Sequence, residues 1–174
     1  DEDKKLLLPE ISRIDYVSVR EKSAKDLLSL VLPNKKVEVM PDPVILLSTE
    51  EWNKIVDDKY VSKFGKYIFC YFLGNDREQR KKVTAIARTL KMPIVTFPFM
   101  QQSFEYADVL FGNIKLYDAG PAEFVSLISK AELVFTDSFH ATVFAAMFHK
   151  KFRVFKRFAD SDKESMNSRI YDLI

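Results

Sequence analysis

Glycine and cysteine are scarce in this sequence, and each shortage excludes a class of site. With four glycines among 174 residues, the chain contains neither a G-x-G-x-x-G pattern nor a G-K-[ST] phosphate loop, the usual signatures of dinucleotide and nucleotide binding. The single cysteine, Cys70, excludes an internal disulfide and indicates a reducing compartment. Because Cys70 lies in the apolar run 67–73, we expect a buried and unreactive thiol.

Long apolar runs and an excess of charge of one sign are also missing. No run approaches the roughly 20 apolar residues that a membrane-spanning helix needs, and the start shows no signal-peptide pattern. The 27 basic and 25 acidic residues leave a formal charge of +2, which is too balanced to indicate nucleic acid as a partner. A length of 174 residues with 47% hydrophobic content is typical of one domain, so we expect a single soluble, cytoplasmic unit.

The chain does contain a regular alternation of two hydrophobic periods. Short β-type runs are followed by segments with helical spacing about six times, with short loops between them. The expected strands are residues 15–19, 37–40, 67–73, 93–97, 114–117, 133–135 and 152–155. The expected helices start near Ser23, Ser48, Asp76, Pro121 and Ser138. This alternation predicts an α/β fold with a doubly wound, mostly parallel, Rossmann-like sheet, in which the apolar run 67–73 is central.

The stretch 131–152 shows the pattern most clearly. Residues 133–135 form a short apolar run, and Ser138 ends a polar break that suits a helix N-cap. This order places His140 in the first turns of a helix at the carboxyl end of a strand. Ligands of parallel α/β sheets bind beyond that edge, where helix N-termini offer N–H groups and partial positive charge. We therefore expect an anionic substrate beside His140.

Metal and triad chemistry are poorly supported by the sequence. His140 and His149 are nine residues apart, which separates them by about 13 Å along a helix and prevents them from sharing one ion. Ser138 and His140 invite a hydrolase interpretation with Asp137, but residues two apart on a helix do not face each other. No G-x-S-x-G elbow is present either.

Five short motifs point to a known family. In chain order they are S-V-R-E at 18–21, D-P-V at 42–44, G-P-A-E-F-V at 120–125, T-D-S-F-H at 136–140 and N-S-R-I at 167–170. Together they resemble the polysaccharide pyruvyl transferase family over nearly the whole chain. That family is similar in architecture to B-type glycosyltransferases, in which two Rossmann-like lobes face a cleft. By this resemblance, residues 1–174 correspond to the C-terminal lobe with its preceding hinge, and we expect the N-terminal lobe to be missing.

The resemblance implies transfer of pyruvate from phosphoenolpyruvate to a pair of sugar hydroxyls, forming a cyclic ketal in bacterial surface polysaccharide or exopolysaccharide biosynthesis. His140 matches the histidine that binds or protonates the donor, and Arg20 matches the arginine that grips phosphoenolpyruvate. The further substrate-binding candidates are Ser138, Lys156, Arg157, Asn167, Ser168 and Arg169. Because Arg and Lys can neutralise the leaving phosphate, we expect no metal and no cofactor. The implied acceptor is a saccharide, free or lipid-linked, which also admits a position at the inner face of the membrane.

Other interpretations stay open at this point. The same two-lobed architecture serves glycosyltransferases that use a nucleotide sugar, and a lobe that only binds sugar or a partner is a third option. Arg20 can instead form an ion pair with Glu21 or Asp42, and Asp42 between two prolines is typical of a turn or helix cap. Trp52 is expected to pack, and most of the basic residues in 77–82 are expected to face solvent.

Overall fold

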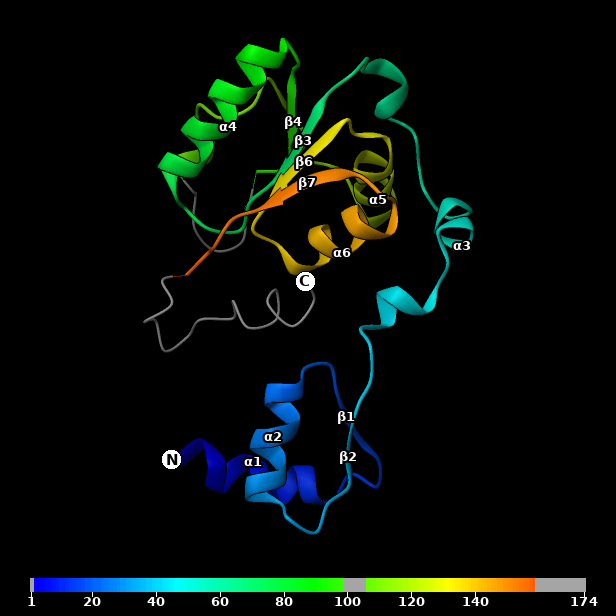
Figure 1. Cartoon of the computed structure of the whole chain (residues 1–174), viewed down its shortest axis with the longest axis vertical. Helices are drawn as coiled ribbons and strands as arrows, with labels where there is room; N and C mark the ends of the chain where they lie inside the picture. The colour runs from blue at the N-terminus through cyan, green and yellow to red at the C-terminus, as the bar shows by residue number, and fades with distance from the viewer. Residues whose placement is uncertain (1, 99–105, 159–174) are drawn as a thin grey trace. The chain divides into compact units, whose positions relative to one another are not determined.

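The computed structural model describes residues 2–98 and 106–158, and these residues form two compact units. The small unit holds the described residues up to Leu46, and the large unit begins at Leu47 (Figure 1). Length and composition predicted a single unit, whereas the structure shows two. The reason is that the first 46 residues build a separate pair of strands instead of extending the main sheet.

The small unit is built on that pair of parallel strands. Its elements are α1 (Glu2–Ser12), β1 (Val17–Val19), α2 (Lys22–Val31), β2 (Val37–Val39) and the 3₁₀ helix η1 (Pro43–Leu46). β1 and β2 pair with Val17 opposite Val37 and Val19 opposite Val39. α2 begins directly after the extended Glu21, so the cap predicted at Ser23 is wrong: the chain turns into helix as soon as the strand ends.

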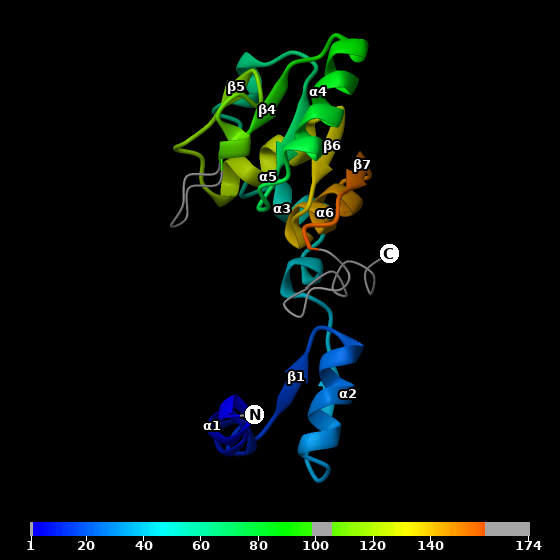
Figure 2. The ribbon, with the colours of Figure 1, turned by 90° about the vertical axis from the view of Figure 1, so that its left-hand side faces the viewer.

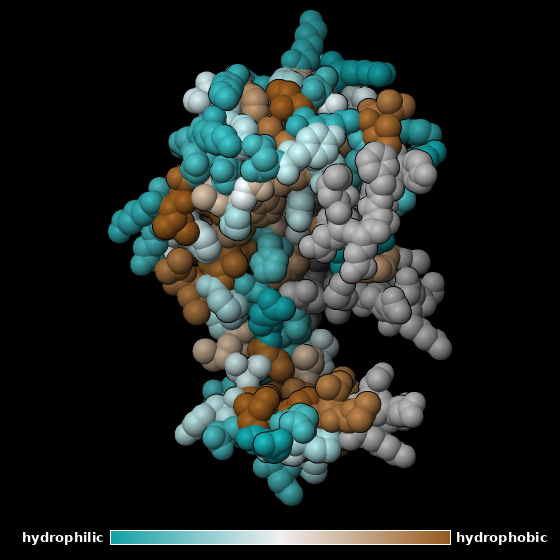
Figure 3. All heavy atoms as spheres, turned by 180° about the vertical axis from the view of Figure 1, so that it is seen from behind, coloured by the Kyte–Doolittle hydropathy of each residue, from teal (hydrophilic) through white to brown (hydrophobic). Residues whose placement is uncertain are grey.

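Apolar side chains are exposed on the small unit. The exposed fraction is 94% for Tyr16, 81% for Leu30 and 70% for Leu6, and α2 buries none of its residues. Apolar surface is visible on this unit in Figure 3. Exposed apolar surface of this kind is typical of a face that a partner or another part of a protein covers.

The large unit contains a five-stranded sheet in which all strands are parallel. Its elements are α3 (Thr49–Asn53), η2 (Val61–Lys63), β3 (Ile68–Tyr71), α4 (Arg77–Leu90), β4 (Ile94–Thr96), η3 (Tyr106–Asp108), β5 (Ile114–Lys115), α5 (Pro121–Lys130), β6 (Leu133–Thr136), α6 (Phe139–Met147) and β7 (Lys151–Val154). The strand order is β5-β4-β3-β6-β7, with β3 in the centre (Figures 1 and 2). The predicted doubly wound α/β fold is confirmed.

Helices cover both faces of this sheet. On one face, Cys70 of β3 belongs to a buried cluster that includes Val83 of α4. On the other face, Phe69 packs edge-on against Phe124 of α5, with ring centroids 5.9 Å apart. The central strand is therefore buried on both sides, as its apolar sequence predicted. Cys70 is fully buried, which confirms the prediction of a buried thiol, and burial raises the pKa of this thiol well above the usual value.

The helix starts in the large unit follow their sequence signals. The Asp76 side chain accepts hydrogen bonds from the first-turn N–H groups of α4, and Pro121 occupies the first turn of α5. Ser48 forms a capping box with Glu51 at the start of α3. Within the described residues, none of these helices combines the length and the apolar character that crossing a bilayer requires.

Arg80 departs from the solvent-facing stripe that the sequence predicted for α4. It is only 3% exposed, and its Nε donates to Asp108 Oδ1 at 2.6 Å. The guanidinium also lies 5.0 Å from the ring centroid of Phe72 and 5.8 Å from that of Phe111. A buried arginine needs both a counter-ion and hydrogen-bond acceptors, and Arg80 has both. This residue fastens α4 to the segment before β5.

Candidate active site

A cavity of about 440 Å³ lies at the carboxyl ends of the central strands. Four elements contribute to it: the end of β3, the end of β4, the start of α5 and the first turns of α6. The lining residues are Tyr71, Leu73, Phe97, Ala119, Gly120, Pro121, Phe124, Ser138, His140 and Phe144. This is the edge of a parallel sheet at which α/β proteins bind ligands, so it is our candidate active site.

His140 lies on the first turn of α6 and lines this cavity. Its position follows from the residues before it: the Ser138 side chain accepts a hydrogen bond from the Ala141 N–H, while the Ser138 N–H donates to Thr136 Oγ1 at 3.0 Å. Only Asp137 and Ser138 therefore separate β6 from α6. His140 is exposed, and its ring lies edge-on to that of Phe139 with 5.5 Å between centroids.

The electrostatics of the two helix starts differ. α6 has no acidic residue in its first turn, so its partial positive charge faces the cavity without a competing carboxylate on that turn. In α5, the Glu123 side chain accepts a hydrogen bond of 2.9 Å from the Gly120 N–H. That carboxylate already offsets the positive end of α5. The start of α6, which carries Ser138 and His140, is therefore the better anion site.

Asp137 joins the turn before α6 to the turn before α4. Its two carboxylate oxygens accept hydrogen bonds from the N–H groups of Leu73 at 2.7 Å and Gly74 at 2.9 Å. Burial raises the pKa of Asp137 above its ordinary value, while these hydrogen bonds and the nearby Arg157 and Arg80 oppose the rise. Asp137 thus shapes the cavity from outside it, since it holds Leu73 in place.

Arg157 and Lys156, both predicted to bind substrate, follow β7. The side chain of Arg157 lies against Gly74, because a Cβ added at Gly74 would meet Arg157 Cγ at 3.0 Å. Its Nε is buried without a hydrogen-bond partner in the part of the chain that the structure describes. Lys156 is exposed, and its carbonyl accepts a hydrogen bond from Gln79. Neither side chain is among the described residues that line the cavity.

Tyr71 is a cavity residue that the sequence interpretation treated only as core. It closes β3 opposite Thr136 of β6, and its ring packs edge-on against Phe124 at 5.1 Å between centroids. Burial, followed by the charge of Asp137, raises the pKa of its phenol, which therefore stays protonated at neutral pH. Its place as the last residue of a central strand was the available signal.

Arg20 lies in the small unit, at the end of β1, and forms an ion pair with Asp42. Asp42 is buried, and its Oδ1 accepts a hydrogen bond from the Val44 N–H, which confirms the expected turn or cap role. The arginine side chain remains 41% exposed. Its predicted grip on the donor remains a prediction, because His140 belongs to the other unit.

Some predictions lie elsewhere. Asn167, Ser168 and Arg169 lie outside the described residues. Trp52 packs edge-on against Phe144 with 4.9 Å between ring centroids, as expected. His149 follows α6 with a positive φ of 51° and is exposed, far along the helix from His140. Among the described residues, no three His, Cys, Asp or Glu side chains are grouped so that they could hold a metal ion.

Comparisons with known proteins give a family and a fold. The model of the polysaccharide pyruvyl transferase family matches residues 1–157. A search of curated proteins by sequence gave no match. Among solved structures, the chain is similar to the Methanocaldococcus jannaschii UDP-GlcNAc 2-epimerase in complex with UDP-GlcNAc and UDP, with a TM-score of 0.51 and 18% sequence identity. The match covers 79% of this chain and 44% of the epimerase chain, so this chain spans less than half of that protein.

Proposed function

Because the chain belongs to the polysaccharide pyruvyl transferase family, an enzyme family, we propose that it binds phosphoenolpyruvate and takes part in transferring pyruvate to a pair of saccharide hydroxyls. One observation carries this proposal: the cavity at the sheet edge brings together the start of α6, the imidazole of His140 and the neutral phenol of Tyr71. The acceptor is a saccharide of a surface polysaccharide or exopolysaccharide, free or lipid-linked. The single buried Cys70 suits the reducing conditions of the cytoplasm, where we place the protein.

The cavity has two kinds of wall, and the donor has two matching parts. Its lining includes the aromatic rings of Phe97, Phe124 and Phe144 and the polar start of α6. Phosphoenolpyruvate carries an apolar methylene group beside a phosphate and a carboxylate. The anionic groups fit the helix start, where N–H groups and the dipole favour negative charge, and the methylene fits against the rings.

In the proposed reaction, His140 gives a proton to the methylene carbon of the donor, which becomes the methyl group of the product. One acceptor hydroxyl adds to the adjacent carbon, the C–O bond to phosphate breaks, and the second hydroxyl closes the ketal. The two hydroxyl protons leave, one to the departing phosphate and one to restore the acid. The products are a pyruvate ketal and hydrogen phosphate. Donor and acceptor thus supply every atom of these products, and no redox step is involved.

The other groups stabilise charge in this scheme. The Tyr71 phenol, which is protonated at neutral pH, donates a hydrogen bond to the departing phosphate. Arg157, Lys156 and Arg20 stay sequence-based predictions for the cations that neutralise the donor. No metal or cofactor is needed in this scheme, because protein N–H groups and cations neutralise the leaving group.

The test compares two histidines near the two ends of α6. His140→Ala should lower turnover by about 100-fold or more, the range typical of a lost general acid, while His149→Ala should leave it unchanged. Turnover is measured on the full-length protein with phosphoenolpyruvate and a saccharide acceptor, and circular dichroism checks the fold of each variant. Equal activity of His140→Ala and the parent protein would reject the proposed role.

The main competitor is a lobe that binds a nucleotide sugar, and it is worth testing because the solved epimerase is described with UDP-GlcNAc and UDP. Thermal unfolding with either ligand separates the two functions, since a ligand that binds the native state raises its melting temperature. We expect protection by phosphoenolpyruvate and none by UDP. Protection by UDP alone would favour the nucleotide-sugar function, and protection by neither ligand would favour an inert sugar-binding or partner-docking lobe.

A further inference from the structure

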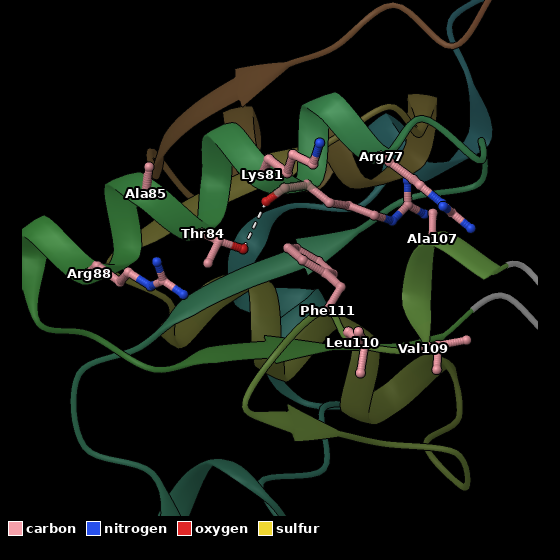
Figure 4. Close-up of a pocket in the computed structure, with 10 residues that line it drawn as sticks. Arg77, Lys81, Thr84, Ala85, Arg88, Ala107, Val109, Leu110 and Phe111 are labelled. Carbon is pink, nitrogen blue, oxygen red and sulfur yellow. Dashed lines mark hydrogen bonds between the residues drawn. The ribbon is translucent and has the colours of Figure 1, made fainter.

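A second concave surface lies on the α4 face of the large unit. A groove runs between α4 and the segment 107–113, where cavities of about 540 Å³ and about 470 Å³ share Thr84, Arg88 and Leu110. Figure 4 shows the first of these cavities. None of its lining residues lines the candidate active site. The groove is therefore a separate feature of the molecule.

The α4 side of this groove is strongly basic. Arg77, Lys81 and Arg88 line it at helical spacing, and Lys91 lines its far end. Residues 77–91 contain six basic residues and one acidic residue, a local charge of +5 in a chain whose total is +2. This segment therefore carries a larger net positive charge than the chain as a whole.

Few of these basic side chains form ion pairs among the described residues. Arg80 is buried against Asp108, and exposed Lys81 bonds to Glu78 at 2.7 Å. For Arg77 and Arg88, which are exposed, the structure shows no ion pair among the residues it describes. These two exposed cations line the groove and are available to an external anion.

The opposite side of the groove presents apolar side chains at a turn. Leu110 is 96% exposed and Val109 is 42% exposed. The turn is anchored on both sides, because Asp108 is paired with Arg80 and Phe111 is only 3% exposed. Lys115 Nζ also donates a hydrogen bond to the Val109 carbonyl. Leu110 is therefore almost fully exposed to water, although the turn that carries it is fixed in place. No contact among the described residues accounts for this exposure.

We propose that this surface binds an anionic phospholipid bilayer. In this arrangement, Arg77 and Arg88 contact lipid phosphates and Leu110 enters the interfacial layer. The basic side chains indicate an anionic partner, because opposite charges attract. Cations alone would suit any polyanion, but an exposed leucine beside cations is typical of a surface that binds a bilayer.

The test is sedimentation of the protein with mixed phosphatidylglycerol and phosphatidylcholine vesicles, compared with pure phosphatidylcholine vesicles. We expect binding to the anionic vesicles only, with loss at high salt. Arg77→Gln/Arg88→Gln should lower the partition coefficient by about 25-fold, at roughly fivefold for each cation. Leu110→Ser should lower it by about tenfold, because the leucine no longer leaves water.

The matched control is Lys63→Gln/Lys130→Gln, which removes two exposed cations of the large unit away from the groove. We expect it to keep parent-level binding, and circular dichroism to show all variants folded. Absence of vesicle binding, equal loss in the control, or no effect of Leu110→Ser would each overturn the proposal. Binding of soluble polyglutamate in place of vesicles would assign the groove to an acidic protein instead.

Discussion

At the scale of single residues, the candidate site depends on close packing around one carboxylate. Asp137 holds the N–H groups of Leu73 and Gly74, and Arg157 packs over the same turn. Gly74 is needed here for space and not for an unusual φ: an added Cβ would lie 3.0 Å from both Arg157 Cγ and Asp137 Oδ2. The turn therefore has no room for a side chain.

We predict that Gly74→Ala destabilises the protein by about 1–2 kcal/mol, since overpacking a tight site forces its neighbours to shift. Gly65→Ala is the matched control, because no atom lies within 4 Å of a Cβ added there. Urea unfolding of both variants measures the difference. Equal stability of the two variants would show that Asp137 and Arg157 yield without cost.

A second residue prediction concerns Tyr67, whose phenol donates a hydrogen bond of 2.7 Å to the Leu127 carbonyl. Burial, and then the charge of Asp58, raises its pKa above the ordinary value of 10.0. Below pH 10 this contribution to stability is complete, and it is lost as pH rises further, because the unfolded chain releases the proton first. Tyr67→Phe should cost about 1 kcal/mol at pH 7 and flatten the loss of stability above pH 10.

The measurement is urea unfolding at several pH values, with Tyr117→Phe as the control, since Tyr117 is 66% exposed. We expect the control to keep the parent's alkaline slope. A parent-like slope in Tyr67→Phe would contradict the assigned cause.

At the scale of elements, a buried ion pair adds to the apolar contacts that hold α4 to the rest of its unit. Arg80 donates hydrogen bonds to Asp108 and to the carbonyls of Asp76 and Gly74. One side chain thus connects α4, its N-cap and the segment before β5. This arrangement also anchors the turn that carries Leu110. A surface pair on the same helix, Lys81 with Glu78, provides a direct comparison.

We predict that Asp108→Ala costs about 3–5 kcal/mol, because it leaves the buried Arg80 charge without a counter-ion. Glu78→Ala should cost about 0.5 kcal/mol or less, since exposed pairs on a helix contribute little. Thermal or urea unfolding measures both. A similarly small loss of unfolding free energy in the two variants would mean that water reaches Arg80 and that its ion pair with Asp108 does not stabilise the position of α4.

Most elements of the large unit could be predicted from sequence, because their signals are local. Asp76, Pro121 and Ser138 mark helix starts by residue type, and alternating hydrophobic periods separate strands from helices. The burial of Arg80 could not be predicted, since its partner Asp108 is 28 residues away and its spacing on α4 resembles that of solvated neighbours.

The part of the candidate site that could be predicted from sequence also depends on local signals. The strand, cap and helix around His140 are contiguous, so its place at the sheet edge followed from sequence alone. Tyr71 was missed because an apolar strand gives no sign of which residue opens into a cavity. That information depends on β6 lying beside β3, which pairs Tyr71 with Thr136, 65 residues later.

At the scale of the whole molecule, the residues predicted to bind the donor belong to two different units. His140 and Ser138 line the cavity of the large unit together with Tyr71, which the sequence did not predict, whereas Arg20 forms an ion pair with Asp42 in the small unit. The family assignment spans both units, since it covers residues 1–157. The cavity of the large unit is therefore the proposed donor site, and the role of Arg20 stays a separate prediction.

The most direct test of the central claim is a crystal structure of the protein with phosphoenolpyruvate bound. We predict the ligand in the cavity at the carboxyl ends of β3, β4 and β6, with an anionic oxygen within hydrogen-bond distance of the first turn of α6. The methylene carbon should face His140, and the Tyr71 hydroxyl should contact the phosphate. Phosphoenolpyruvate bound elsewhere on the protein, with this cavity holding only water, would contradict the account.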